Sequence, residues 1–192
     1  ETEISAYDLR SMYAMGISLR LPLTNHDVSP EEYEANIPLF KKHQRPGNSI
    51  IITNDNLARW IRRDFPKYRI EASVIKNIDN LRKLDKAARI YDSVILPMSA
   101  NLDEEFLVSI ENKAQITLFA NAGCALTCPS RMCYRSISRI NKTGDTSLFT
   151  CSRNLKYREL LGMQDFDLDY LEGLGFHRFK LLRPRPGNMT GF

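Results

Sequence analysis

The stretch IIITNDNLARWIRRDFPKYRIEASVI (residues 50–75) carries the pattern that decides the fold. It opens with a continuous apolar run, as expected of a strand buried on both faces. Asn54 or Asp55 then caps an amphipathic helix, which Pro66 ends. Residues 68–75 form the next predicted strand. A strand, a helix and a strand in quick succession predict a right-handed βαβ unit with parallel strands.

The same alternation extends in both directions along the chain. Strands are predicted at 17–23, 49–53, 68–75, 93–97, 116–121 and 177–184. Besides the helix after Asn54, helices are predicted at 5–16, 77–91, 101–113, 153–162 and 167–175, and one beginning at Pro129. Another begins at the capping box of Ser29 and runs towards His43, with an interruption at Pro38. Six strands are two fewer than a closed eight-stranded barrel has. Either the first strands lie outside this sequence, or one between 142 and 176 leaves no clear pattern.

These elements predict an α/β fold that is TIM-barrel-like: a partial or complete barrel of parallel strands with alternating helices, in a single domain over 1–192. No GxGxxG or GxxxxGK[ST] loop follows any strand, so a Rossmann or P-loop nucleotide site has little support. No Ser/His/Asp or HExxH pattern is visible either, and we expect no protease.

Composition is that of a soluble globular protein, with 43% hydrophobic and 26% charged residues. The apolar runs are far shorter than the roughly 20 residues that cross a bilayer, so no membrane segment is expected. Residues 1–123 carry 16 Lys and Arg against 17 Asp and Glu, whereas residues 124–192 carry 11 against 6. The cysteine-bearing part, 116–192, is therefore basic. This charge fits an anionic small molecule or RNA as partner, or simply a solvated basic face.

The four cysteines have the spacing Cys124-x3-Cys128-x4-Cys133-x17-Cys151. They are too sparse for a disulfide scaffold, so a metal site or buried thiols in a reducing compartment, the cytoplasm, is expected. The spacing matches neither zinc fingers nor the common ferredoxins. Cys124 follows a strand and Cys128 precedes a predicted helix, whose dipole favours the metal-binding thiolate.

Helical geometry separates one cysteine from the others. If the helix begins at Pro129, Cys133 shares a face with Ile137 and Ile140, which is a core stripe. Cys133 is then either a fourth ligand or a small buried hydrophobe. All four cysteines could also be reduced core residues, or two of them could form one disulfide. The better ligand candidates are the other three: Cys124, Cys128 and Cys151.

Candidate substrate-binding residues follow from the fold, because active sites of parallel α/β proteins collect at the carboxyl ends of the strands. Asn25 and Asn121 end two predicted strands, and their amides can hydrogen-bond a ligand. Arg131, Arg135 and Arg183 can hold an anionic group by charge-assisted hydrogen bonds.

Several short pieces together resemble the collagenase-like peptidase family, which includes TIM-barrel proteins of ubiquinone, tRNA and ribosomal RNA hydroxylation. The pieces are Asn-x-Gly-Cys at 121–124, Cys-Pro-x-Arg at 128–131, the stretch 50–75, and LEGLGFHRFKLLRP at 171–184. The resemblance implies a barrel and, as in several members, an iron–sulfur cluster held by cysteines, for which Cys124 and Cys128 match best. It departs from the family at Leu182-Arg183-Pro184, where relatives end in Gly-Arg.

The leading expectation is a protein that binds a 4Fe-4S cluster through Cys124, Cys128 and Cys151, with Cys133 as the fourth ligand unless it is a core residue. The cluster would support hydroxylation or other redox chemistry on a small molecule or RNA. The alternative is a non-enzymatic module, zinc-stabilised or cysteine-cored, that binds nucleic acid or a protein partner. A third hypothesis, a metal-free hydrolase or lyase, predicts that activity survives replacement of all the cysteines.

Overall fold

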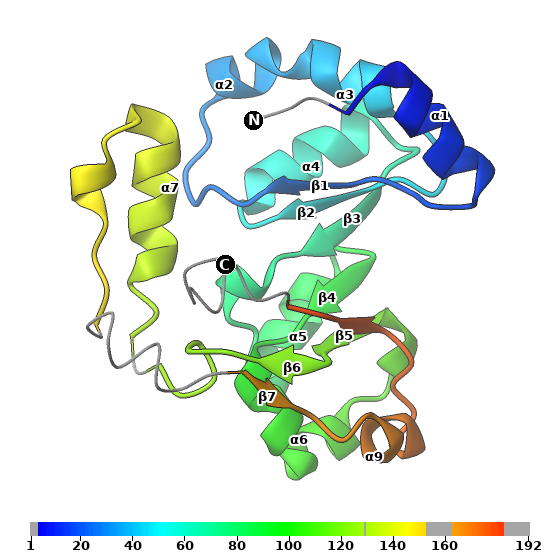
Figure 1. The fold of residues 1–192 in the computed structure, drawn as a ribbon, viewed down its shortest axis with the longest axis vertical. Helices are drawn as coiled ribbons and strands as arrows, with labels where there is room; N and C mark the ends of the chain where they lie inside the picture. The colour runs from blue at the N-terminus through cyan, green and yellow to red at the C-terminus, as the bar shows by residue number, and fades with distance from the viewer. Residues whose placement is uncertain (1–3, 129, 153–162, 183–192) are drawn as a thin grey trace.

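Six parallel strands form one curled sheet in the computed structural model, which describes residues 4–128, 130–152 and 163–182. The strand order is β1-β2-β3-β4-β5-β8, and every neighbouring pair is parallel. The sheet curls into a half-barrel with helices outside it (Figure 1). The strands are β1 (Arg20–Leu23), β2 (Ser49–Ile52), β3 (Arg69–Ala72), β4 (Ser93–Ile95), β5 (Ile116–Phe119) and β8 (Phe179–Lys180). The predicted α/β, incomplete TIM-like barrel is confirmed.

The helices alternate with these strands. They are α1 (Ala6–Ala14), α2 (Pro30–Ala35), α3 (Ile37–His43), α4 (Asp55–Asp64), α5 (Leu81–Ala88), α6 (Glu104–Ser109), α7 (Cys133–Thr143) and α9 (Leu168–Gly173). Short 3-10 turns lie at η1 (Val74–Lys76), η2 (Met98–Leu102), η3 (Lys113–Gln115) and η4 (Thr146–Leu148). A small antiparallel pair, β6 (Asn121–Ala122) with β7 (Gln164–Asp165), carries no sequence pattern that predicts it. The helix predicted at 153–162 lies outside the described residues.

Local side chains set the helix boundaries. Ser29 and Glu32 form the predicted capping box of α2, and Asn36 separates α2 from α3. Pro38 lies in the first turn of α3, where its missing N–H costs no hydrogen bond. Asn54 caps α4 by accepting a hydrogen bond from the backbone N–H of Leu57 at 3.0 Å.

The main core lies between the sheet and the helices outside it. Successive strand residues point to opposite faces of a sheet, so alternate apolar residues of each strand face the helices. Ile50, Ile70 and Leu118 belong to this outer core. A smaller apolar cluster on the concave inner face includes Ile51 and Phe119. Burial on both faces explains why the central strands β2, β4 and β5 are mostly apolar along their length.

The concave face becomes polar away from the mouth of the half-barrel. Glu71 on β3 is 2% exposed, and its carboxylate receives a two-point contact from the Arg20 guanidinium on β1. In that contact Arg20 Nε donates to Glu71 Oε1 at 3.0 Å. Burial alone would raise the pKa of Glu71, but hydrogen bonds from Arg20 and Ser49 and the charge of Arg20 leave it below its usual value.

No helix within the described ranges is long and apolar enough to cross a membrane.

Candidate functional site

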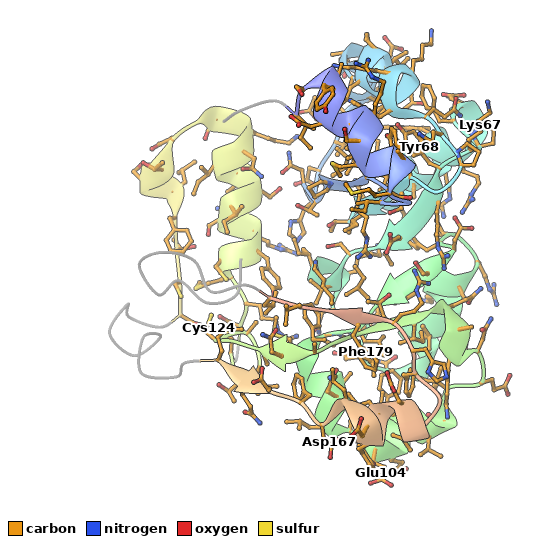
Figure 2. All side chains as sticks on the ribbon, turned by 45° about the vertical axis from the view of Figure 1, so that its right-hand side comes forward. Lys67, Tyr68, Glu104, Cys124, Asp167 and Phe179 are labelled. Atoms are coloured by element: carbon orange, nitrogen blue, oxygen red, sulfur yellow. The ribbon has the colours of Figure 1, made fainter. Side chains whose placement is uncertain are left out.

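Two of the four cysteines lie on the connection between β5 and α7, at the carboxyl end of the sheet, and a third begins α7. After β5 the chain makes the short strand β6 and a tight turn that carries Cys124. Cys128 follows, and Cys133 is the first residue of α7. After α7 the chain forms η4 and turns back alongside α7, and Cys151 follows η4. Figure 2 labels Cys124 beside the lower end of α7.

The tertiary structure gathers these four thiols, which we call the cysteine cluster (Cys124, Cys128, Cys133 and Cys151). Burial first, and then the charges of Cys151, Cys128 and Cys124, together raise the pKa of the Cys133 thiol to about 11. Such an influence requires proximity, because charges separated by more than about 10 Å are largely screened. No disulfide joins any two of these four cysteines.

A single metal ion would require the thiols of the cysteine cluster to lie very close together. Four thiolates on one zinc ion, at about 2.3 Å each, would bring their sulfurs within about 4 Å of one another. Among the residues that the structure describes, no three His, Cys, Asp or Glu side chains are arranged to hold a single ion. Four cysteine thiolates are also the ligand set of a 4Fe-4S cluster, in which each thiolate binds a different iron.

Cys128 has two polar neighbours besides the other thiols. The backbone N–H of Arg131 donates to Cys128 Sγ at 3.3 Å, and Ser152 Oγ lies 3.4 Å from the same sulfur. Hydrogen bonds to ligand sulfurs are among the factors that set the reduction potential of an iron–sulfur centre. The surroundings of Cys128 therefore suit a thiolate.

The helix predicted to begin at Pro129 begins four residues later, at Cys133, and that boundary prediction is wrong. Arg131 has φ +48°, in the left-handed region, which a right-handed helix cannot include. Arg131 therefore precedes α7, whereas Arg135 and Arg139 lie on it. Cys133 is buried, as expected of the stripe it was assigned to, and it also belongs to the cysteine cluster.

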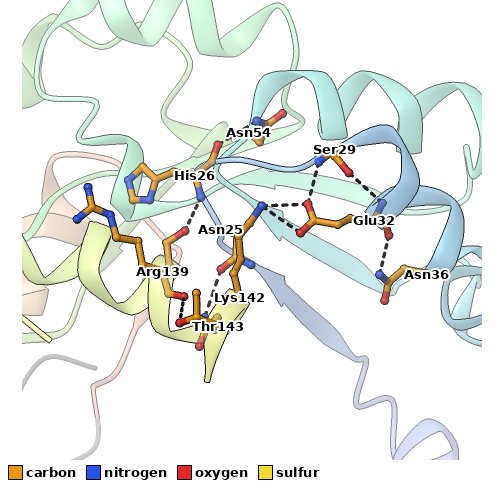
Figure 3. A network of polar contacts seen from close by, with 11 residues as sticks. Asn25, His26, Ser29, Glu32, Asn36, Asn54, Arg139, Lys142 and Thr143 are labelled. Carbon is orange, nitrogen blue, oxygen red and sulfur yellow. Dashed lines mark hydrogen bonds and ion pairs between the residues drawn. The ribbon is translucent and has the colours of Figure 1, made fainter. Parts of the chain in front are cut away.

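Polar contacts hold α7 across the mouth of the half-barrel (Figure 3). The backbone N–H of His26 donates to Ser138 Oγ at 3.0 Å, across 112 positions of sequence. Asn141 Nδ2 donates to Asn25 Oδ1 at 3.3 Å, and Lys142 Nζ pairs with a Glu32 carboxylate oxygen at 3.0 Å. These contacts fix the helix, and with it the cysteine loop, against the ends of the strands.

A cavity of about 440 Å³ lies between the concave face of the sheet and α7, and we call it the barrel-mouth cavity. Asn25, one of the predicted ligand residues, lies in its wall. So does Lys180, whose pKa is lowered first by burial and then by the charge of Arg20, against the effect of Glu71. The remaining wall is mostly apolar and includes Pro22, Ile51, Val74, Ile75, Met98, Phe119, Ile137 and Leu182, with Thr24, Ser73, Tyr134, Ser138 and Asn141.

A second cavity, of about 550 Å³, lies beside the first, and we call it the basic pocket. Its wall contains the predicted ligand residues Arg131 and Arg135. The other wall residues are His26, Thr53, Ile75, Lys76, Asn77, Ser130, Met132 and Tyr134. Ile75 and Tyr134 also line the barrel-mouth cavity, so the two cavities adjoin.

The remaining predicted ligand residues are Asn121 and Arg183. Asn121 is 6% exposed, and both ends of its amide hold the backbone of Leu182: Nδ2 donates to the carbonyl at 3.0 Å, and Oδ1 accepts from the N–H at 2.8 Å. Arg183 lies outside the described residues. Thr53, Lys76 and Lys180 also line the cavities, although no sequence motif identifies them as site residues. The sequence indicates them only through their position at or shortly after the end of a strand.

Comparison with known proteins supports this architecture. No protein-family model and no curated protein sequence matches the chain. Among solved structures, the fold is similar to that of the U32 peptidase Mk0906, with a TM-score of 0.62 over 95% of this chain and 78% of that one. The two sequences are 13% identical, so the similarity establishes a shared fold. The relation to the collagenase-like (U32) peptidases is thus confirmed at the level of the fold.

Proposed function

We propose that this protein is an iron–sulfur protein in which Cys124, Cys128, Cys133 and Cys151 hold a 4Fe-4S cluster at the mouth of the half-barrel. The observation that carries the proposal is the gathering of these thiols from a strand-end turn, the first residue of α7 and the segment beyond η4. The number and type of these side chains match the four-cysteine ligand set of such a cluster. A reducing compartment such as the cytoplasm would keep them as thiols.

The proposed activity is hydroxylation or related redox chemistry on an anionic small molecule or RNA. When bound, a cluster of this kind supplies one-electron transfer. The chain's own part is to bind and orient the substrate. The barrel-mouth cavity and the basic pocket both adjoin α7, whose first residue is Cys133. The guanidinium groups of Arg131 and Arg135 would hold the anion.

Anaerobic purification followed by iron and sulfide analysis tests the cluster. We expect about four irons and four sulfides per chain, with absorbance near about 400 nm. Single replacements of each cysteine by alanine should lower the iron content. Ser152→Ala should keep the iron but shift the reduction potential, because it removes a neighbour of Cys128 Sγ and no ligand.

The matched control is Ser147→Ala, on the exposed part of η4 between Cys133 and Cys151, and it should retain full iron. Protein free of iron and sulfide after anaerobic preparation and reconstitution would refute the proposal. Stoichiometric zinc without iron, together with salt-sensitive RNA binding, would instead support the non-enzymatic module. Retention of iron by Cys133→Ala alone would reassign that residue to the core.

A further inference from the structure

We propose that the basic pocket binds the phosphate group of a small phosphorylated metabolite. This deepens the proposed function by naming the substrate class, and it rests on that function only in placing the ligand beside the cysteine cluster. The pocket lies beyond the carboxyl ends of β1, β2 and β3, where parallel α/β proteins bind ligands. Its volume of about 550 Å³ leaves room for an organic body besides the phosphate.

The wall of the pocket carries positive charge without a carboxylate. Arg131, Arg135 and Lys76 line it, and among the described residues no Asp or Glu does. The charge of Lys76 is partly neutralised, because its Nζ lies 2.7 Å from Oδ1 of Asp55, a residue that does not line the pocket. The Arg131 guanidinium has neutral acceptors, Asn77 Oδ1 and, at 3.3 Å, Ser99 Oγ. These contacts orient the guanidinium and leave its charge uncompensated.

Arg135 supplies the second uncompensated charge. Within the described part of the chain its guanidinium makes no hydrogen bond or ion pair, and the side chain is exposed on α7. The positive charge of Arg135 acts on His26. The pKa of His26 is lowered first by burial, then by the charge of Arg135, and less by Lys76, while Asp27 acts in the opposite direction. The potential in the pocket therefore disfavours another cation and favours an anion.

Two buried polar atoms in the wall lack hydrogen-bond partners among the described residues. They are Thr53 Oγ1 and His26 Nδ1. Thr53 is 8% exposed, and it directly follows β2. Folded proteins leave few buried polar groups unpaired, because each costs about 1–3 kcal/mol. A ligand oxygen that accepts a hydrogen bond from the Thr53 hydroxyl would give this buried group the partner it lacks.

The donors favour a phosphate over a carboxylate. A phosphate monoester carries up to two negative charges and three acceptor oxygens, enough for two guanidinium groups and a hydroxyl at once. A carboxylate has one charge and two oxygens. Asn77 and Ser130 add polar side chains to the wall, which suits a hydroxyl-rich body such as a sugar. The ligand class is therefore a phosphorylated polar metabolite.

Calorimetry with inorganic phosphate, a nucleoside 5′-monophosphate and the matching nucleoside tests the inference. We expect saturable binding of the first two, tighter for the monophosphate, and none for the nucleoside. Arg135→Met and Thr53→Val should each weaken binding by about tenfold or more. Thr53→Val should not lower the melting temperature, since the hydroxyl has no partner to lose, and this separates a ligand role from a structural one.

Arg139→Met is the matched control, because it removes the same charge one turn further along α7 at a residue that does not line the pocket. It should leave monophosphate binding unchanged. Equal loss in Arg139→Met and Arg135→Met, or the absence of saturable phosphate binding, would overturn the inference. So would an RNA oligonucleotide that binds much more tightly than the monophosphate with a steep salt dependence.

Iron is measured in the same samples, with and without reconstitution. Phosphate binding by iron-free protein would uphold the pocket even where the iron–sulfur proposal fails. Full iron without phosphate binding would reject the pocket alone.

Discussion

Arg131 connects the two parts of the site at the scale of a single residue. Its backbone N–H donates to Cys128 Sγ, and its guanidinium reaches Asn77 on the wall of the basic pocket. Holding a non-glycine residue at φ +48° costs roughly 1 kcal/mol. The strained backbone is offset by contacts on both sides, so a single residue joins the cysteine loop to the anion site.

Asn121 offers a residue-scale prediction about stability. Asn121→Ala removes both hydrogen bonds to the Leu182 backbone and leaves those polar groups without their partner. We expect the free energy of unfolding to fall by about 2–4 kcal/mol in urea denaturation. Asn121→Asp keeps an acceptor for the Leu182 N–H but loses the donor, so it should also destabilise.

The control is Asn112→Ala, since Asn112 is exposed and its side chain makes no capping bond, and its effect should stay within about 0.5 kcal/mol. If Asn121→Ala leaves stability unchanged but abolishes ligand binding, Asn121 acts on a ligand and not as a clamp.

The element that matters most is α7, because it carries Cys133 and closes one side of both cavities. Its contacts with the barrel differ in burial. Ser138 is 7% exposed and accepts from the His26 backbone, whereas the Lys142–Glu32 ion pair is between side chains that are 32% and 44% exposed. Buried hydrogen bonds contribute more than exposed ion pairs. The hold on α7 therefore depends chiefly on Ser138.

Ser138→Ala should loosen α7 more than Lys142→Ala does. We expect a loss of about 1–2 kcal/mol for Ser138→Ala, because the His26 N–H is left without its acceptor. Lys142→Ala should cost less than about 1 kcal/mol. Hydrogen exchange of the α7 amides together with urea denaturation measures both effects. The reverse order of the two variants would contradict this account of how the helix is held.

At the scale of the whole molecule, Glu71 connects strands that are not neighbours. It lies on β3, and its partner Arg20 lies on β1, with β2 between them. The contact therefore links β1 to β3 across β2 on the concave face. Removing one member of a buried pair leaves an uncompensated charge or an unpaired polar group.

Glu71 predicts how stability depends on pH. Its folded-state pKa lies below the ordinary value of 4.5, so its contribution is present above that value and is lost as the pH falls through the folded-state pKa. Glu71→Gln should destabilise the protein by about 2–3 kcal/mol near pH 7. The difference from the parent protein should shrink between about pH 5 and about pH 3.

The measurement is urea denaturation across that pH range. Glu111→Gln, at an exposed position, serves as the control and should follow the parent curve. A difference between Glu71→Gln and the parent that grows on acidification would contradict the assigned sign.

Elements were predictable where their signal is local. The six strands of the sheet follow from apolar runs or, at 17–23, from alternating apolar and polar residues, and the starts of α2 and α4 follow from Ser29 and Asn54. The start of α7 was not predictable from Pro129, because the chain turns through a left-handed Arg131 whose partners lie elsewhere in the structure. The β6–β7 pair escaped because two-residue strands carry no periodicity.

By itself, the sequence determined the strand and helix order, the half-barrel class and the identity of the thiol and guanidinium groups, since each depends on residue type and near neighbours. Only the tertiary structure decided that Cys151 lies near Cys133, that α7 rests on His26 and Asn25, and that Thr53 lines the same pocket as Arg135. These relations join residues far apart in sequence, as with the 112 positions between His26 and Ser138. They depend on how the curled sheet brings its strand ends together, which no local pattern encodes.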